Sequence, residues 1–249
     1  EIQRRLVGSE MCIRDRRNLV LSCSLFLFVF GALPVSLQAE RPNFIIIFTD
    51  DQGYGDLSCF GSETIETPNI DRLAKEGRKF TSFMVASPVC TPSRAALMTG
   101  CYPKRVGMHQ HVLFPTSKKG LNPEEHTIAD HLKSQGYATA CFGKWHLGHQ
   151  PEVLPTSQGF DTYLGIPYSN DMNHPDNKGK PQGGFKGMDL LWADPESTLT
   201  KWKTPLIENE TIVELPVDQR TVTRRYTQRA IDFVTEHQDE PFLVYLPHS

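Results

Sequence analysis

Residues 43–51, NFIIIFTDD, decide the fold class of this chain. This continuous run of β-branched and aromatic residues, apolar on both faces, is typical of a central strand in a parallel sheet. The run ends abruptly in two carboxylates, Asp50 and Asp51. In open α/β sheets, ligands bind beyond the carboxyl ends of the strands. The stretch therefore predicts a buried strand with a polar site at its end.

Helical and strand patterns alternate along the rest of the chain. Helices are expected at residues 67–77, 93–100, 124–136 and 221–237, and strands at residues 79–86, 137–142 and 241–247. This alternation predicts an α/β fold with a doubly wound, mostly parallel sheet flanked by helices.

The helices carry apolar faces and end signals. In the first helix, Ile70, Leu73 and Ala74 share one helical face, and Gly77 can supply a left-handed cap. Gly100 and Gly136 are expected to end the next two helices. The last helix carries one apolar stripe: Val222, Tyr226, Ala230, Phe233 and Val234.

The N-terminal region is expected to lie outside the folded domain. Residues 1–10 resemble neither a signal peptide nor a folded element, so we treat them as extraneous sequence. Residues 11–39 predict a secretory signal peptide, because three arginines precede an apolar run that ends at Pro34 and Ala39 supplies a small residue for cleavage. An uncleaved anchor is the alternative. We therefore expect a secreted or periplasmic protein without stable membrane insertion after signal cleavage.

Residues 40–249 are expected to form the folded part. Between about residues 151 and 217 the pattern dissolves into Gly, Pro, Asn and Lys, which predicts an irregular insertion of the kind that forms lids or walls. The sequence stops directly after a strand pattern, so we expect a domain truncated at its C-terminus. The net charge of −3 predicts no nucleic-acid partner.

Four cysteines follow the expected cleavage site: Cys59, Cys90, Cys101 and Cys141. Their spacings match no CxxC zinc pattern and no dense disulfide framework. In an exported chain some of them could still pair.

Three loops are expected to converge at one edge of the sheet. Asp50 and Asp51 follow the first strand, Cys90 follows the second, and GKWHLG at residues 143–148 follows the third. Adjacent carboxylates repel unless a cation or hydrogen bonds hold them, so a hard divalent cation with oxygen ligands is one hypothesis. An exposed Asp-Asp turn is the alternative, and it is the better one on these two residues alone.

Cys90 lies in a turn suited to anions. It precedes a helix expected to begin at about Pro92 or Ser93, so it faces free backbone N–H groups and the positive end of the helix dipole. Arg94 adds a guanidinium suited to tetrahedral oxyanions. A thiolate nucleophile is one interpretation. An oxidising compartment makes a free catalytic thiol hazardous, which favours a different chemistry at Cys90.

Lys144 and His146 lie two residues apart and can point the same way around Trp145. A cation and an imidazole beside an acidic site suggest an anionic substrate with a leaving group that needs a proton. A surface lysine and a structural histidine packed beside Trp145 are the alternative.

Four stretches together resemble the sulfatase family. CTPSRAALMTG at residues 90–100 contains the family's C-x-P-x-R motif, GKWHLG resembles its second motif, and RPNFIIIFTDDQGYGD at residues 41–56 resembles its opening strand and metal loop. GFDTYLGIPYSND at residues 159–171 is similar to a further segment of the arylsulfatase branch. Four motifs in family order make a chance match negligible. The resemblance covers nearly all of residues 41–249 and implies an alkaline phosphatase-like fold.

The resemblance implies a nucleophile and a metal. Cys90 matches the cysteine that the family oxidises to formylglycine, whose hydrated aldehyde attacks the substrate. Asp50 and Asp51 match two carboxylate ligands of a calcium ion, Ca2+, which the modified Cys90 would also contact. Arg94 matches the group that steadies the hydrated aldehyde, and His146 matches a hydrogen-bonding partner to it.

The resemblance also implies substrate contacts and a reaction. Lys144 matches a contact to the substrate sulfate, and Ser169 falls where the arylsulfatase branch has a serine near the substrate. The implied activity is hydrolysis of sulfate esters of a small molecule or glycan, with a formylglycine-generating enzyme as maturation partner. A phosphomonoester or phosphonate hydrolase of the same superfamily and a non-catalytic binding homologue are the alternatives.

Overall fold

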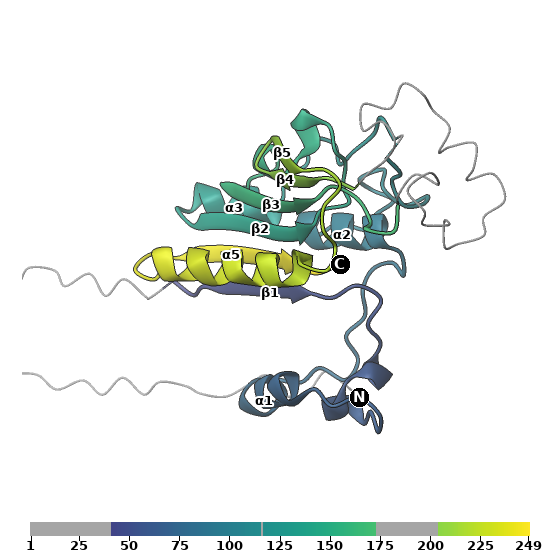
Figure 1. The fold of residues 1–249 in the computed structure, drawn as a ribbon, viewed down its shortest axis with the longest axis vertical. Coiled ribbons are helices and arrows are strands. Elements are labelled where there is room, and N and C mark those ends of the chain that lie inside the picture. The colour runs from purple at the N-terminus through teal and green to yellow at the C-terminus, as the bar shows by residue number, and fades with distance from the viewer. Residues whose placement is uncertain (1–40, 116, 173–203) are drawn as a thin grey trace, which may run out of the picture. The chain divides into compact units, whose positions relative to one another are not determined.

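The computed structural model describes residues 41–115, 117–172 and 204–249 (Figure 1). The expected signal peptide, the residues before it and residues 173–203 of the expected insertion lie outside the described residues. Within those described ranges, no helix is long and apolar enough to cross a membrane.

The described strands form a single sheet. In spatial order they are β1 (Phe44–Phe48), β6 (Phe242–Pro247), β2 (Ala138–Lys144), β3 (Thr162–Ile166), β4 (Leu206–Glu208) and β5 (Thr211–Glu214). The first four strands run parallel, and the pairs β3–β4 and β4–β5 are antiparallel. This order confirms the prediction of an α/β fold with a mostly parallel sheet.

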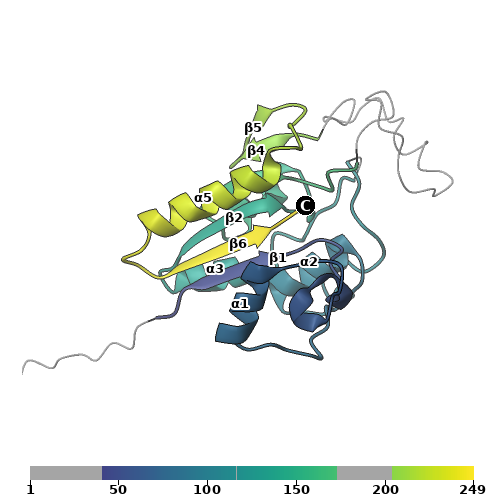
Figure 2. The ribbon, with the colours of Figure 1, turned by 60° about the horizontal axis from the view of Figure 1, so that its bottom comes forward.

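The helices are α1 (Pro68–Glu76), α2 (Cys90–Thr99), α3 (Ile128–Ser134) and α5 (Val222–Glu236). The 3-10 helices are η1 (Tyr54–Asp56), η2 (Ser58–Phe60), η3 (Pro151–Val153) and η4 (Pro155–Ser157). Figure 2 shows α5 on one face of the sheet and α2 and α3 on the other. Helices therefore flank both faces, as the doubly wound arrangement requires.

Side chains that alternate along β6 explain the two layers. Val244 packs in the core that contains Tyr226 of α5. The next residue, Tyr245, belongs to the core that contains Met98 of α2 and Ala129 of α3. Because successive side chains of a strand point to opposite faces, an entirely apolar strand must have a core on each side. The predicted stripe of α5 is confirmed, since most of it is buried.

The expected irregular insertion contains regular structure. β3, β4 and β5 all lie between residues 151 and 217, and β3 pairs with β2. The prediction of an irregular segment was wrong for these strands. They are short, and the apolar residues within them are few, so periodicity alone does not reveal them.

The strand predicted at residues 79–86 is absent from the structure, and these residues form bends without strand pairing. Their apolar side chains are exposed: Phe80 by 61%, Phe83 by 67% and Met84 by 83%. Among the described strands β1 pairs with β6 alone, so it lies at the edge of the described sheet and not at its centre. Ile45 and Ile47 are 53% and 56% exposed, so the expected burial of this strand is not observed either. The strand predicted at residues 79–86 rested on composition, which shows a preference for strand but supplies no pairing partner.

Two predicted helix ends differ from those observed. α2 begins at Cys90, two or three residues before the expected start at Pro92 or Ser93, so Cys90 belongs to its first turn. Gly77 has a φ of −109° and forms no left-handed cap. Gly100 and Gly136, with φ of 66° and 78°, do adopt the left-handed conformation that ends α2 and α3. The apolar face of α1 is largely open to solvent, with Ile70 37% and Leu73 59% exposed.

Candidate active site

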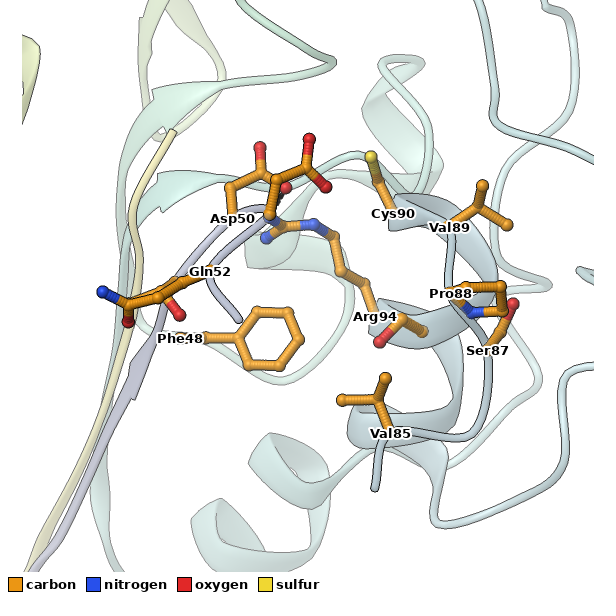
Figure 3. A pocket seen from close by; sticks show the side chains of 12 residues that line it. Phe48, Asp50, Gln52, Val85, Ser87, Pro88, Val89, Cys90 and Arg94 are labelled. Atoms are coloured by element: carbon orange, nitrogen blue, oxygen red, sulfur yellow. Dashed lines mark ion pairs between the residues drawn. The ribbon is translucent and has the colours of Figure 1, made fainter. Parts of the chain in front are cut away.

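Cys90, Asp50 and Arg94 meet at a pocket of about 240 Å³ beyond the end of β1 (Figure 3). Cys90 reaches this edge from the first turn of α2, whereas the sequence pattern predicts it in a loop that follows a strand. Its thiol is free and partly exposed. The predicted convergence of Asp50 and Cys90 at one edge is therefore confirmed, although the element that carries Cys90 is a helix.

Lys144, the last residue of β2, links the groups of the site. Its side chain is only 1% exposed, and its Nζ lies 2.5 Å from Asp50 Oδ2, 3.1 Å from Ser169 Oγ and 3.5 Å from Cys90 Sγ. The alternative of a surface lysine is thus wrong. Because β2 and β3 are parallel neighbours, the end of β2 and Ser169, three residues after β3, come together at the same edge.

Arg94 provides a second buried cation. Its Nη1 donates to the carbonyl of Lys144 at 2.7 Å, and its Nη2 lies 3.7 Å from Asp50 Oδ1. Its guanidinium also lies over the ring of Phe48, 5.3 Å from the centroid. Among the described residues, Nε and Nη2 have no hydrogen-bond acceptor. Two buried N–H groups of a guanidinium therefore remain available to an anion.

His146 is buried and neutral. Burial lowers its pKa to about 3, and the nearby charges of Lys144 and Arg94 add to this shift. Its Nε2 lies 2.8 Å from the carbonyl of Leu113, whereas Nδ1 is buried without a hydrogen-bond partner in the part of the chain that the structure describes. Its backbone has a φ of 58°. His146 is therefore a fixed group with one free ring nitrogen.

Asp50 and Asp51 supply the hard oxygen donors that calcium prefers. Asp51 is exposed at the pocket, with a φ of 54°, and Asp50 is partly buried. Over residues 41–115, 117–172 and 204–249, no group of three or more His, Cys, Asp or Glu side chains could hold a metal ion. The donor chemistry fits calcium, but these two carboxylates make up only part of the six to eight ligands that the ion takes.

Sequence reasoning missed three groups at this site. Thr91 is fully buried and donates from Oγ1 to the carbonyl of His146 at 2.9 Å. The hydroxyl of Tyr245 lies 3.4 Å from Arg94 Nη1, and burial raises its pKa, so it stays protonated. The carbonyl of Leu113 comes from a loop that carries no motif. The alternation of β6 could have indicated Tyr245, but no sequence signal pointed to Leu113.

The four described cysteines are all free, so the suggested pairing is absent among them. Cys141 is fully buried in β2, and burial raises the pKa of its thiol. Its environment is that of a packed core residue.

The fold and the site together define a class of protein: an α/β fold with two buried cations, Lys144 and Arg94, beside a cysteine at the carboxyl ends of its strands. Residues 42–248 match the Sulfatase family. The chain belongs to the sulfatase family, as the resemblance of its motifs predicted.

Individual relatives agree with this assignment. The chain is 41% identical over 235 residues to arylsulfatase G of Rattus norvegicus, covering 92% of the chain and 44% of that relative. It is 41% identical over 231 residues to arylsulfatase A of Homo sapiens, covering 89% of the chain and 43% of that relative. The crystal structure of Ps i-CgsB in complex with k-i-k-neocarrahexaose matches with a TM-score of 0.68 and 35% identity, over 84% of this chain and 45% of that one. The chain thus spans less than half the length of these relatives.

Proposed function

We propose that this chain carries part of the active site of an enzyme that hydrolyses sulfate esters. The observation that carries this proposal is the pair of buried cations beside Cys90: Lys144 Nζ at 3.5 Å from its sulfur, and Arg94, whose Nε and Nη2 have no hydrogen-bond acceptor among the described residues. Buried cations bind an anion more strongly than exposed ones, because water screens them less. The names of the relatives, arylsulfatases, make sulfate the preferred oxyanion.

Arg94 and Lys144 differ in the geometry with which each would contact a bound anion. The planar guanidinium of Arg94 is held by the Lys144 carbonyl and by the ring of Phe48, so its position is fixed before substrate binds. Lys144 presents a point charge held between Asp50 and Ser169. A sulfuryl group beside Cys90 would receive charge from both, and charge that develops on its oxygens would be stabilised without rearrangement of the site.

Cys90 is the proposed nucleophile position. In its oxidised form, formylglycine, it would supply a hydrated aldehyde as the attacking group. A free thiol in the first turn of α2 is available for that modification. The neutral imidazole of His146 retains one unprotonated nitrogen, Nδ1, that can accept a hydrogen bond from a hydroxyl group of the hydrate.

Asp50 and Asp51 are the proposed calcium ligands of this chain. Bound there, calcium would neutralise negative charge on the sulfuryl oxygens. Asp50 also holds Lys144 through the 2.5 Å contact, so it orders a cation at the site in its own right. Ser169 fixes Lys144 from the opposite side.

The direct test is conversion and turnover of the intact protein. We expect mass spectrometry to detect formylglycine at residue 90 after coexpression with a formylglycine-generating enzyme, and we expect the product to hydrolyse 4-nitrophenyl sulfate. Lys144→Ala should lower kcat/KM by about 100-fold or more, since one buried charged contact is removed. Lys133→Ala is the matched control, because Lys133 is half exposed and pairs with Asp161, which precedes β3, whereas Ser169 beside Lys144 follows it. If mass spectrometry detected unmodified cysteine and no formylglycine at residue 90, the proposal would be contradicted.

A phosphate ester hydrolase is the second candidate, because Lys144 and Arg94 suit any tetrahedral oxyanion. Rates on 4-nitrophenyl sulfate and 4-nitrophenyl phosphate, measured on one preparation, separate the two. We expect the sulfate ester to be the better substrate. A non-catalytic homologue would instead retain unmodified Cys90 when isolated from its native host.

The remaining proposals concern the substrate, the maturation partner and the location of the protein. A sulfated small molecule or glycan is the proposed substrate, and the formylglycine-generating enzyme is the proposed maturation partner. Export to a secreted or periplasmic location is proposed from the expected signal peptide at residues 11–39. N-terminal sequencing of the secreted product tests the cut after Ala39.

A further inference from the structure

A closed ring of hydrogen bonds ties Thr91 to His146. The hydroxyl of Thr91 donates to the carbonyl of His146 at 2.9 Å and accepts from the backbone N–H of Leu113 at 3.1 Å. The carbonyl of Leu113 in turn lies 2.8 Å from Nε2 of His146. Thr91 and His146 are both 0% exposed. Three segments distant in sequence are thus joined through one hydroxyl group.

The ring fixes the backbone of His146 in an unfavourable conformation. Its φ of 58° lies in the left-handed region, which costs a residue other than glycine about 1–2 kcal/mol. The backbone N–H of His146 donates to the carbonyl of Pro167 at 3.1 Å, and its carbonyl is held by Thr91. A strained residue persists only where its surroundings determine its position, and these two bonds do so from opposite sides.

The ring also fixes the tautomer of the imidazole. A backbone carbonyl can only accept, so Nε2 of His146 must carry the proton that is donated to Leu113. In the neutral imidazole, Nδ1 then holds a lone pair. That atom is buried and has no hydrogen-bond partner among the described residues. The ring of hydrogen bonds therefore engages Nε2 and leaves Nδ1 free.

We infer that Thr91 is a positioning residue for His146, which holds the left-handed backbone, the ring orientation and the Nε2–H tautomer through its hydroxyl group. The inference rests on the proposed function only where it concerns turnover. Thr91 directly follows Cys90, so the same turn of α2 that carries the nucleophile position also fixes the imidazole. A change at Thr91 is therefore expected to affect His146 selectively, because Lys144 is held separately by Asp50 and Ser169.

The first experiment measures the tautomer in the intact protein. Thr91→Val keeps the shape of the side chain and removes the hydroxyl, whereas Thr91→Ser keeps the hydroxyl. With 15N-labelled histidine, the wild type and Thr91→Ser should show one protonated and one unprotonated ring nitrogen for His146, assigned with His146→Asn. In Thr91→Val these two resonances should move toward each other as the tautomers mix. Unchanged resonances in Thr91→Val would overturn the inference.

The second experiment measures kcat and KM for sulfate ester hydrolysis. Each kcat is calculated per molecule that carries formylglycine, and peptide mass spectrometry gives that fraction for each variant. In Thr91→Val, two hydrogen bonds are lost, and kcat should fall about tenfold to 100-fold while KM stays within about twofold. Thr91→Ser should stay within about threefold of wild type. Equal kcat in Thr91→Val and wild type would overturn the inference.

A folding control separates a positioning role from a structural one. Thermal unfolding is measured for every variant, and if Thr91→Val does not fold, Thr91→Ala, which removes the same hydroxyl, takes its place. A wild type without sulfate ester hydrolysis would refute the proposed function alone, since the nitrogen resonances test the ring of hydrogen bonds independently of turnover.

Discussion

Residues 137–147 and residues 79–86 have similar compositions and different structures. Both contain aromatic and small or β-branched residues, and both were predicted to contain a strand. In the first, β2 pairs with β6 on one side and β3 on the other, and every residue from Cys141 to Leu147 is buried. In the second, no strand forms and residues 79–86 are all exposed.

The difference shows what a strand needs besides composition. β2 has neighbours that satisfy its backbone N–H and C=O groups on both edges and apolar cores on both faces. Residues 79–86 have no neighbouring strand and no buried core among the described residues, and the carbonyl of Phe83 instead accepts a hydrogen bond from the Tyr54 hydroxyl at 2.6 Å. This difference bears on the candidate site, because Lys144 is the last residue of β2 and His146 follows two residues later.

The region that contains α1 is held mainly by polar contacts. Asp71 accepts hydrogen bonds from Ser58 Oγ at 2.6 Å, from Cys59 N at 2.9 Å and from Thr67 Oγ1 at 3.0 Å. The hydrogen bond from Ser58, followed by those from Thr67 and Cys59, lowers the pKa of Asp71 against the opposing effect of desolvation. Apolar packing therefore dominates around β2, and one carboxylate organises the residues around η2 and α1.

The largest expected effect on stability comes from adding a side-chain atom between the paired backbones of β2 and β3. In Gly165→Ala, the added Cβ would lie 1.8 Å from the carbonyl oxygen of Gly143, so paired backbones must separate. We expect a loss of more than about 5 kcal/mol in the free energy of unfolding, measured by urea denaturation. Gly55→Ala is the matched control, since no atom lies within 4 Å of its Cβ position, and it should change stability by less than about 1 kcal/mol. Similar losses in both variants would contradict the contrast.

Large apolar side chains test the same contrast. Phe142 is 1% exposed in the core beneath α5, and its ring lies 6.0 Å from that of Phe233. Phe142→Ala should cost about 3–5 kcal/mol by urea denaturation. Phe83→Ala, at a side chain 67% exposed, should cost less than about 0.5 kcal/mol. A loss at Phe83 equal to that at Phe142 would show that residues 79–86 are as tightly packed as β2.

Acid should weaken the buried end of β2 through His146. In the unfolded chain this histidine gains a proton below a pKa of about 6.5. In the folded protein it stays neutral until its pKa of about 3. Its contribution is therefore complete above pH 6.5 and is lost as the pH falls, by about 2 kcal/mol at pH 5. Urea midpoints at pH 7, 6 and 5 should fall more steeply for wild type than for His146→Asn. Parallel curves would show that the imidazole is not buried as described.

The smallest expected effect is local. Asp71→Asn removes the charge that accepts three hydrogen bonds, so residues 58–79 should be cleaved faster in limited proteolysis, about threefold to tenfold. The urea midpoint of global unfolding should change little, because the sheet does not depend on Asp71. Asp239→Asn, at an exposed turn residue, is the control and should not alter cleavage. A large shift of the global midpoint in Asp71→Asn would contradict the separation between the two regions.

Much of the fold could be predicted from the sequence where a long apolar pattern coincides with burial in the folded protein. The apolar stripe of α5 and the apolar run of β6 are long, and tertiary packing buries both. β3, β4 and β5 could not be predicted, because strands of three to five residues carry too few positions for periodicity. The strand at residues 79–86 was predicted wrongly, since strand propensity holds only where a neighbouring strand accepts the segment.

The candidate site divides in the same way. Cys90, Arg94 and Lys144 lie in motifs whose residue types indicate anion chemistry. Their burial and their distances depend on where α2 meets the ends of β2 and β3. Thr91 and Leu113 carry no chemical signal of their own, so their connection to His146 required the folded chain.

By itself, the sequence determined the alternation of strand and helix, the residue types of the site and the family, because periodicity and motifs are local properties of the chain. Only the tertiary structure decided which apolar segments became strands, which cation faces Cys90 and which nitrogen of His146 carries the proton. These outcomes depend on hydrogen bonds between residues 20 to 100 positions apart, such as Lys144 with Asp50 at a separation of 94 residues. Such contacts form only when the folding of the whole domain offsets the entropy of bringing distant segments together.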